Sequence, residues 1–149
     1  MSSPNKNKFF ASLVIIAGLI LPILLPAFIM MAQVKYMPNE ITHSGIMSLF
    51  ILSFVLFIIA SIFTKILSLI GLTEQKIDEL GFLGLIISVL TSFISIIVGY
   101  YWIKTFHLTS VELSSIGILI VAAITTIVLT VLTRMREAII NKKRPARLN

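Results

Sequence analysis

Four side chains of the types that bind divalent metals lie in two short polar segments, 33–44 and 104–112. They are Glu40 and His43 in the first segment, and His107 and Glu112 in the second. Imidazole nitrogens and carboxylate oxygens are common zinc ligands, so the four together form a candidate metal site. No two of them have the spacing of a recognised metal motif, however. We therefore interpret them as solvated loop residues and predict no metal site.

A third polar segment holds a cluster of charges and could suit acid–base chemistry. It contains Glu74, Lys76, Asp78 and Glu79. Asp78 and Glu79 are neighbours in sequence and point about 100° apart on a helix, so they do not form a facing pair of carboxylates. Thr73 is placed to cap a helix whose first turn is acidic, which complements the helix dipole. We interpret the segment as a solvated loop or the start of a helix.

Other catalytic signatures are missing from the sequence. The chain has no cysteine, which removes thiol nucleophiles, disulfides and cysteine metal sites. It has no serine-hydrolase elbow, phosphate-binding P-loop, zinc-protease motif or dinucleotide fingerprint. No acidic residue or histidine lies inside an apolar stretch, which disfavours ion-coupled transport. The sequence therefore predicts a protein that is not an enzyme, with no catalytic residues and no cofactor.

The composition indicates an integral membrane protein. Of 149 residues, 58% are hydrophobic and only 12% are charged, whereas soluble domains average about 25% charged residues. Four apolar runs are long enough to cross a hydrocarbon core of about 30 Å. They are 9–31, 45–70, 80–103 and 113–133. We predict one all-α transmembrane domain over residues 1–149, folded as a four-helix bundle.

The first apolar run follows a short basic segment, as the core of a signal peptide does. Signal cores are about 7 to 15 residues long, so this run is too long, and we interpret it as a retained membrane span. Pro22 and Pro26 lie four residues apart on one face of the expected helix. Each proline removes a backbone donor and crowds the carbonyl one turn earlier. The pair therefore predicts a helix kink, with a transporter-like hinge as the less favoured alternative.

The run 80–103 carries its small residues on one helical face. They are Gly81, Gly84, Ser88, Ser92, Ser95 and Gly99, spaced three and four apart. Because lipid is as apolar as leucine, membrane helices associate through close contact, and small residues let backbones approach each other. We predict that this small-residue stripe is a helix-packing surface. A ligand groove is the less favoured alternative.

Lys65 interrupts the second apolar run near its end. The stretch beyond it, 66–72, remains apolar, so the helix continues while the lysine extends its ammonium to the membrane interface. A buried functional lysine is the less favoured interpretation, because the sequence identifies no buried partner for it.

The distribution of lysine and arginine predicts the orientation. If both termini are cytoplasmic, ten of the twelve basic residues lie inside, leaving Lys35 and Lys104 outside.

The segment 134–149 then forms a basic cytoplasmic tail. Its basic residues are Arg134, Arg136, Lys142, Lys143, Arg144 and Arg147. We expect this tail to contact anionic lipid headgroups or, alternatively, an acidic protein partner. It is too short to supply a folded element that reads nucleic acid, so no nucleic-acid partner is predicted.

The chain resembles the YrvL-like family of small multispan membrane proteins from Gram-positive bacteria. The resemblance lies in overall size and span order, and in the opening of the second span, His43-Ser44-Gly45-Ile46-Met47-Ser48-Leu49-Phe50, where a serine-leucine-aromatic run begins an apolar helix. It implies a regulatory role at the membrane, restraining a sigma-factor system.

These observations favour a small regulator or accessory subunit in a bacterial plasma membrane. It is expected to act through helix packing and its cytoplasmic face, with a membrane protein or a second copy of the chain as partner. A bacteriocin immunity or envelope-stress protein is one alternative. A small transporter or channel subunit, using serine and threonine faces, is another.

Overall fold

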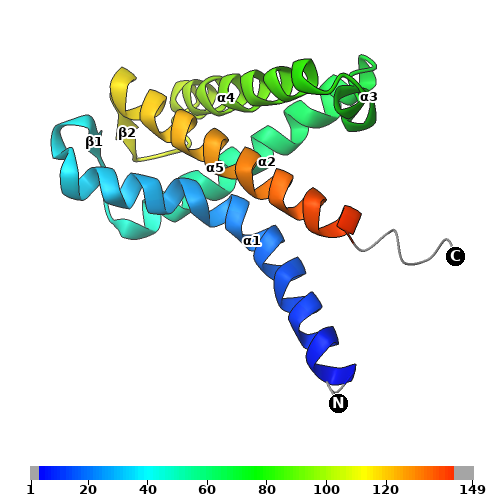
Figure 1. The fold of residues 1–149 in the computed structure, drawn as a ribbon. Coiled ribbons are helices and arrows are strands. Elements are labelled where there is room, and N and C mark those ends of the chain that lie inside the picture. Colours follow the sequence, from blue (N-terminus) through cyan, green and yellow to red (C-terminus); the bar gives the residue numbers. More distant parts are fainter. Residues whose placement is uncertain (1–3, 143–149) are drawn as a thin grey trace, which may run out of the picture.

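The structure is a computed structural model that describes residues 4–142, and it is built from four long helices (Figure 1). They are α1 (Pro4–Tyr36), α2 (Ile46–Leu69), α4 (Phe82–Thr105) and α5 (Ser115–Lys142). Each is long and apolar enough to cross a membrane. The predicted all-α bundle with four apolar helices is therefore confirmed. Helices α1, α4 and α5 run beyond the expected spans, because a helix satisfies its own backbone groups outside the hydrocarbon as well as inside it.

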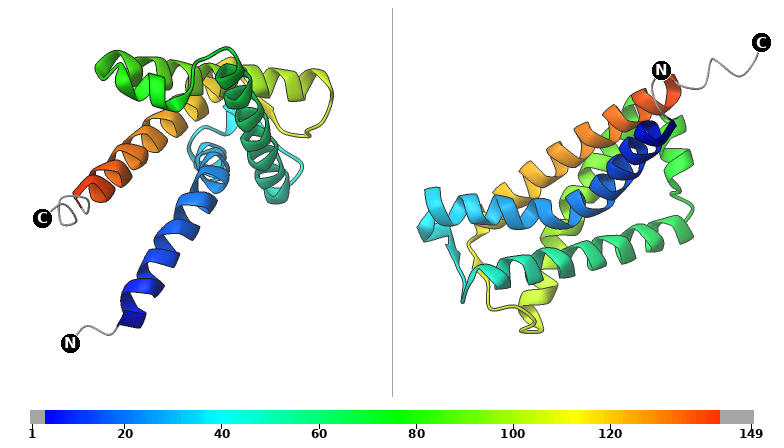
Figure 2. Two further views of the ribbon diagram at one scale, coloured as in Figure 1. Left: turned by 90° about the vertical axis from the view of Figure 1, so that its right-hand side faces the viewer. Right: turned by 90° about the horizontal axis from the view of Figure 1, so that it is seen from below.

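The four helices form a closed ring of neighbours. α1 contacts α2, α2 contacts α4, α4 contacts α5, and α5 contacts α1. Successive helices run in opposite directions, so the start of α1 and the end of α5 lie at the same end of the bundle (Figure 2). We call this the terminal end. The opposite end, where α1 joins α2 and α4 joins α5, is called the ladder end.

The two loops at the ladder end are bonded to each other. After α1 the chain forms a short 3₁₀ helix, η1 (Pro38–Glu40), and then β1 (Ile41–Thr42). β1 pairs in antiparallel fashion with β2 (Glu112–Leu113), with Ile41 opposite Leu113. The segments predicted as two separate loops therefore form one small two-stranded sheet that joins the two helical hairpins.

Side chains and backbone groups around this sheet complete the connection. Ser114 donates its backbone N–H to the carbonyl oxygen of Glu40 at 2.9 Å, and its hydroxyl donates to the Glu40 carboxylate. The same hydroxyl accepts from the N–H of Gly117 at 2.9 Å and so caps α5. Gln33 of α1 is buried and donates to the carbonyl of Gly117 at 3.0 Å. A Cβ atom on Gly117 would lie 2.7 Å from the Glu40 carbonyl oxygen, so this approach requires glycine.

Tyr100 of α4 is the largest fully buried side chain, and it holds β2. Its hydroxyl accepts from the N–H of Leu113 at 2.6 Å and lies 3.3 Å from the Leu113 carbonyl oxygen, to which it donates. The next two residues, Tyr101 and Trp102, are exposed. Tyr100 is buried because adjacent helical residues point about 100° apart and this one faces the bundle.

The packed core occupies only the half of the bundle near the ladder end. Apart from Gly84, the buried residues among the described side chains of the long helices fall within the ranges 26–33 in α1, 49–56 in α2, 95–103 in α4 and 117–126 in α5. Toward the terminal end the helices diverge, most visibly the first half of α1 and the last half of α5 (Figure 2). The bundle is therefore packed at one half and open at the other.

α1 continues as one helix through Pro22 and Pro26 and bends near its middle (Figure 1). Ser53 of α2 is fully buried at this point. Its hydroxyl accepts from the N–H of Ala27 at 3.2 Å and donates to the carbonyl of Ile23, two groups that pair with each other in a regular helix. Proline disturbs helical bonding at this point, and the neighbouring helix supplies the replacement partner.

Replacing Tyr100 by Phe tests the bond to β2. We expect Tyr100→Phe to lower the free energy of unfolding by about 1–3 kcal/mol, because the buried N–H of Leu113 loses its partner. Tyr101→Phe is the matched control, since Tyr101 is 44% exposed, and it should change stability by less than about 0.5 kcal/mol. Thermal unfolding of both variants in detergent gives the comparison. Equal losses in the two variants would show that Tyr100 does not hold β2.

Candidate functional site

The four candidate metal ligands all lie near the ladder end, and at least two of them have structural roles there. His107 follows α4 with a φ of 53°, a left-handed conformation that usually belongs to glycine at a helix end. The next residue, Leu108, donates its N–H back to the carbonyl of Ile103 at 3.1 Å, which closes the helix. Glu40 accepts from the Ser114 hydroxyl. Within residues 4–142, no group of three or more histidine and acidic side chains is positioned to hold a metal ion.

The small-residue stripe of α4 divides into parts with different surroundings. Ser95 and Gly99, in the packed half, are buried. A Cβ atom on Gly99 would lie 3.1 Å from a methyl group of Ile59 and 3.5 Å from one of Leu56, both on α2. At Gly99, therefore, the absence of a side chain sets how closely α2 and α4 approach each other.

At the other end of the stripe, Gly81 and Gly84 allow a short helix, α3 (Glu74–Glu79), to lie against α4. Thr73 caps α3 by accepting the N–H of Lys76 at 3.5 Å, as its position in the sequence suggested. Gly81 has a φ of 56° where the chain turns from α3 into α4. Gly84 is buried, and a Cβ there would lie 1.7 Å from the carbonyl oxygen of Ile77. No other residue fits at Gly84 without moving α3.

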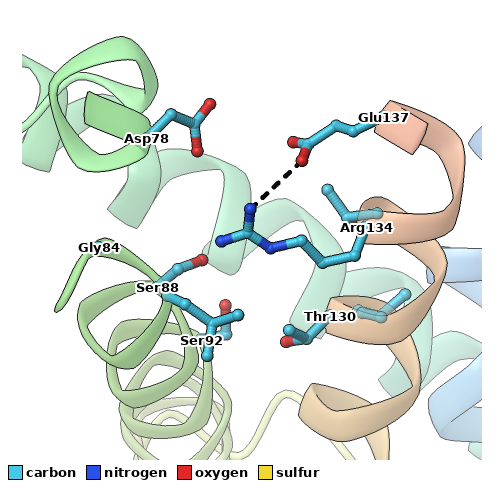
Figure 3. A pocket seen from close by; sticks show the side chains of 10 residues that line it. Asp78, Gly84, Ser88, Ser92, Thr130, Arg134 and Glu137 are labelled. Carbon is cyan, nitrogen blue, oxygen red and sulfur yellow. Dashed lines mark ion pairs between the residues drawn. The ribbon is translucent and has the colours of Figure 1, made fainter. Parts of the chain in front are cut away.

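Ser88 and Ser92, the middle of the stripe, line two cavities in the open half of the bundle. The smaller one, of about 100 Å³, lies between α4 and α5. Figure 3 shows Arg134 of α5 reaching toward Ser88, with the carboxylates of Asp78 and Glu137 nearby. Arg134 and Glu137 form an ion pair at 3.5 Å, and both side chains are partly exposed. Such an exposed pair contributes little stability, about 0.2–1 kcal/mol, so Arg134 is not locked in this position.

The larger cavity, of about 540 Å³, lies between α2, α3 and α4. Its volume is within the range of about 300–1,000 Å³ that is usual for small-molecule sites. Its polar lining comes from Lys65, from Gln75 and from hydroxyl side chains. These hydroxyls are those of Thr64, Ser68, Thr73, Ser88, Thr91 and Ser92. No carboxylate is among the described side chains that line it, in contrast to the smaller cavity.

The predicted basic contact residues are only partly described. Arg134 and Arg136 are exposed on the last turns of α5. Lys142 is the final residue of α5, and Lys143, Arg144 and Arg147 lie outside the described residues. Pro22 and Pro26 lie in α1 across from Ser53, and Pro26 is buried.

Three important residues were not identified from the sequence. Tyr100, Ser53 and Gln33 each bond to the backbone of another element. A partial signal was present for Gln33 and Ser53, since a polar residue on an apolar membrane helix often has a partner on a neighbouring helix. The sequence did not show which helix that neighbour is.

Comparison with protein-family models, with curated proteins and with solved structures found no match to this chain. The site is therefore interpreted from its geometry. Among the described residues, no histidine lines either cavity, and no hydrogen bond joins a lining hydroxyl to a lining carboxylate or lysine. The larger cavity offers hydroxyl groups and a lysine, which suit reversible binding of polar or anionic groups, whereas the smaller one also holds two carboxylates.

The contrast between Gly99 and Ser88 is testable by introducing leucine at each position. We expect Gly99→Leu to cost about 1–3 kcal/mol or more of stability, because it overpacks the contact between α2 and α4. Ser88→Leu adds its bulk to cavity space and should be tolerated. Thermal unfolding in detergent compares the two. If Ser88→Leu destabilises the protein as much as Gly99→Leu, the middle of the stripe is packed and the cavities are not open space.

Proposed function

We propose that this chain is a regulator or accessory subunit of another membrane protein and is not an enzyme. Its four membrane-length apolar helices indicate a small multi-pass membrane protein. Support for the finer proposal comes from the first half of α1, which extends away from the other helices (Figure 1). The regulatory role that the resemblance to the YrvL-like family implies points in the same direction.

The observation that carries the proposal is the exposure of seven consecutive residues, 15–21, in α1. At about 100° per residue, seven residues cover every face of a helix. No side of α1 in this stretch is buried by the rest of the described chain. The stretch also contains a small residue, Gly18, where an added Cβ atom would meet nothing within 4 Å. A neighbouring helix from another protein can approach closely there.

The orientation completes the proposal. We infer that the terminal end faces the cytoplasm of a bacterial cell, because ten of the twelve basic residues belong to the segments at that end. The open half of the bundle, with Arg134 and Arg136, then lies on the cytoplasmic side. A partner that contacts the first half of α1 and extends into the cytoplasm is then on the same side of the membrane as these cations.

In-cell photocrosslinking tests the proposal. Photoreactive amino acids replace Leu19 and Leu21, which lie about 200° apart on α1. Ile51 and Ile62 on α2 are control positions with similar exposure. We expect one defined membrane protein, or a second copy of the chain, to be captured from α1 and not from α2. The same capture pattern from both helices would contradict a specific contact at α1.

A second substitution separates loss of contact from loss of folding. Gly18→Leu adds bulk where the chain itself has no neighbouring atom, so the unfolding temperature should not change. Crosslinking from Leu19 or Leu21 should fall severalfold if a partner helix packs against this side. Unchanged crosslinking in this variant would place the partner on a different face.

A small transporter or channel subunit is the second candidate, and one observation favours it. The cavity of about 540 Å³ is lined by hydroxyls on two membrane helices, and it lies in the open half of a bundle whose other half is packed. A solute would thus enter from the terminal end. Purified protein in sealed liposomes should then conduct ions or small solutes, and Ser92→Leu should reduce the flux. Liposomes that remain tight under every gradient would rule against this candidate.

A further inference from the structure

We propose that the cavity between α2, α3 and α4 binds the phosphate group of an anion, with Lys65 as the counter-charge. The site is independent of the proposed contact at α1. It requires only the residues around the larger cavity, and the chemistry of that lining identifies the class of ligand.

Lys65 supplies the charge. It lies one turn before the end of α2, is exposed, and lines the cavity. The adjacent cavity between α4 and α5 contains Arg134, but there Asp78 and Glu137 balance the cation. Among the described side chains around the larger cavity there is no such carboxylate. The ammonium of Lys65 beside several hydroxyl groups favours an anion as the ligand of this cavity.

Hydroxyl and amide groups supply the remaining hydrogen bonds. The hydroxyl of Thr64 donates to the carbonyl of Ala60 at 2.9 Å within its own helix, so it offers no proton to a ligand. Ser88 and Ser92 come from α4, across the cavity, and the amide of Gln75 comes from α3. Phosphate oxygens accept several hydrogen bonds at once and bind strongly when one donor is charged. A lysine with surrounding hydroxyls matches that requirement.

The apolar part of the lining identifies a phospholipid as the expected source of the phosphate. Leu67, Leu72 and Ile77 line the same cavity. Next to Lys65 on α2, Ile62, Ile66 and Leu69 are exposed. A headgroup bound at Lys65 thus has apolar helix surface beside it for its acyl chains, which free phosphate does not need.

Thermal unfolding of the full chain in neutral detergent tests the site, because a ligand that binds the folded state raises the unfolding temperature with saturation. The probes are phosphatidylglycerol, zwitterionic phosphatidylcholine, and inorganic phosphate with sodium chloride at matched ionic strength. We expect phosphatidylglycerol to stabilise the chain and phosphatidylcholine not to do so. A saturable effect of inorganic phosphate, without a stronger effect of phosphatidylglycerol, supports the phosphate site and assigns it to a soluble ligand.

Two variants and a matched control make the result specific to the cavity. Lys65→Gln should raise the half-saturating concentration about tenfold, since one charge-assisted hydrogen bond is lost. Lys76→Gln is the matched control, because Lys76 is at the same end of the bundle and lines neither cavity. Ser88→Leu narrows the cavity and removes one hydroxyl while leaving Lys65 in place, and it should weaken binding without lowering the unfolding temperature of the unliganded protein.

Three results would overturn the proposal. One is that neither phosphatidylglycerol nor inorganic phosphate stabilises the chain more than phosphatidylcholine and sodium chloride do. Another is that Lys65→Gln binds as well as the natural sequence. The third is that Lys76→Gln loses as much affinity as Lys65→Gln, which would mean a general attraction of anions to a basic protein in place of a defined site.

Discussion

A backbone N–H or carbonyl inside a bilayer has no water to bond, so it must find its partner within the protein. Most of this chain meets the requirement by forming helices. At several places in the described residues a side chain supplies the bond, and two of these places are in the core. Ser53 joins the two ends of the disturbed turn in α1, and Tyr100 holds the backbone of Leu113. Both are in the packed half of the bundle, and each connects two different elements. The buried apolar side chains of the core surround these bonds.

The packed half and the open half of the bundle differ in what their side chains do. The packed half fixes the relative positions of four helices through buried apolar side chains and a few polar bonds. The open half keeps its serine and threonine side chains accessible and has cations at its edge, with Lys65 on one side of α4 and Arg134 on the other. Because the two cavities share Ser88 and Ser92, a ligand in one of them changes the surroundings of the other.

The helices were predictable from the sequence, because long apolar runs have one main solution in lipid. Which faces of those helices are buried was much less so. Tyr100 and Tyr101 are adjacent and chemically identical, yet one is buried and the other exposed. Gly99 and Ser88 belong to the same stripe, yet Gly99 lies against side chains of α2 while Ser88 lines the two cavities. The first difference depends on which face of α4 the other helices cover, and the second on how far α2 follows α4 before the two helices diverge. The spacing of residues within α4 carries no information about either. The pairing of the two loops was not predictable from the sequence either, because β1 and β2 are two residues each and have no strand pattern of their own.

The small sheet also constrains the order in which the protein is made. Ile41 pairs with Leu113, and Gln33 bonds to Gly117, so everything from α2 to the start of α5 must be synthesised before either bond can form. Membrane helices insert first and associate afterwards. During synthesis the first hairpin therefore waits in the membrane with Gln33 and Glu40 lacking their final partners. Arrival of the second hairpin completes the sheet, so the ladder end closes only in a chain that carries both hairpins.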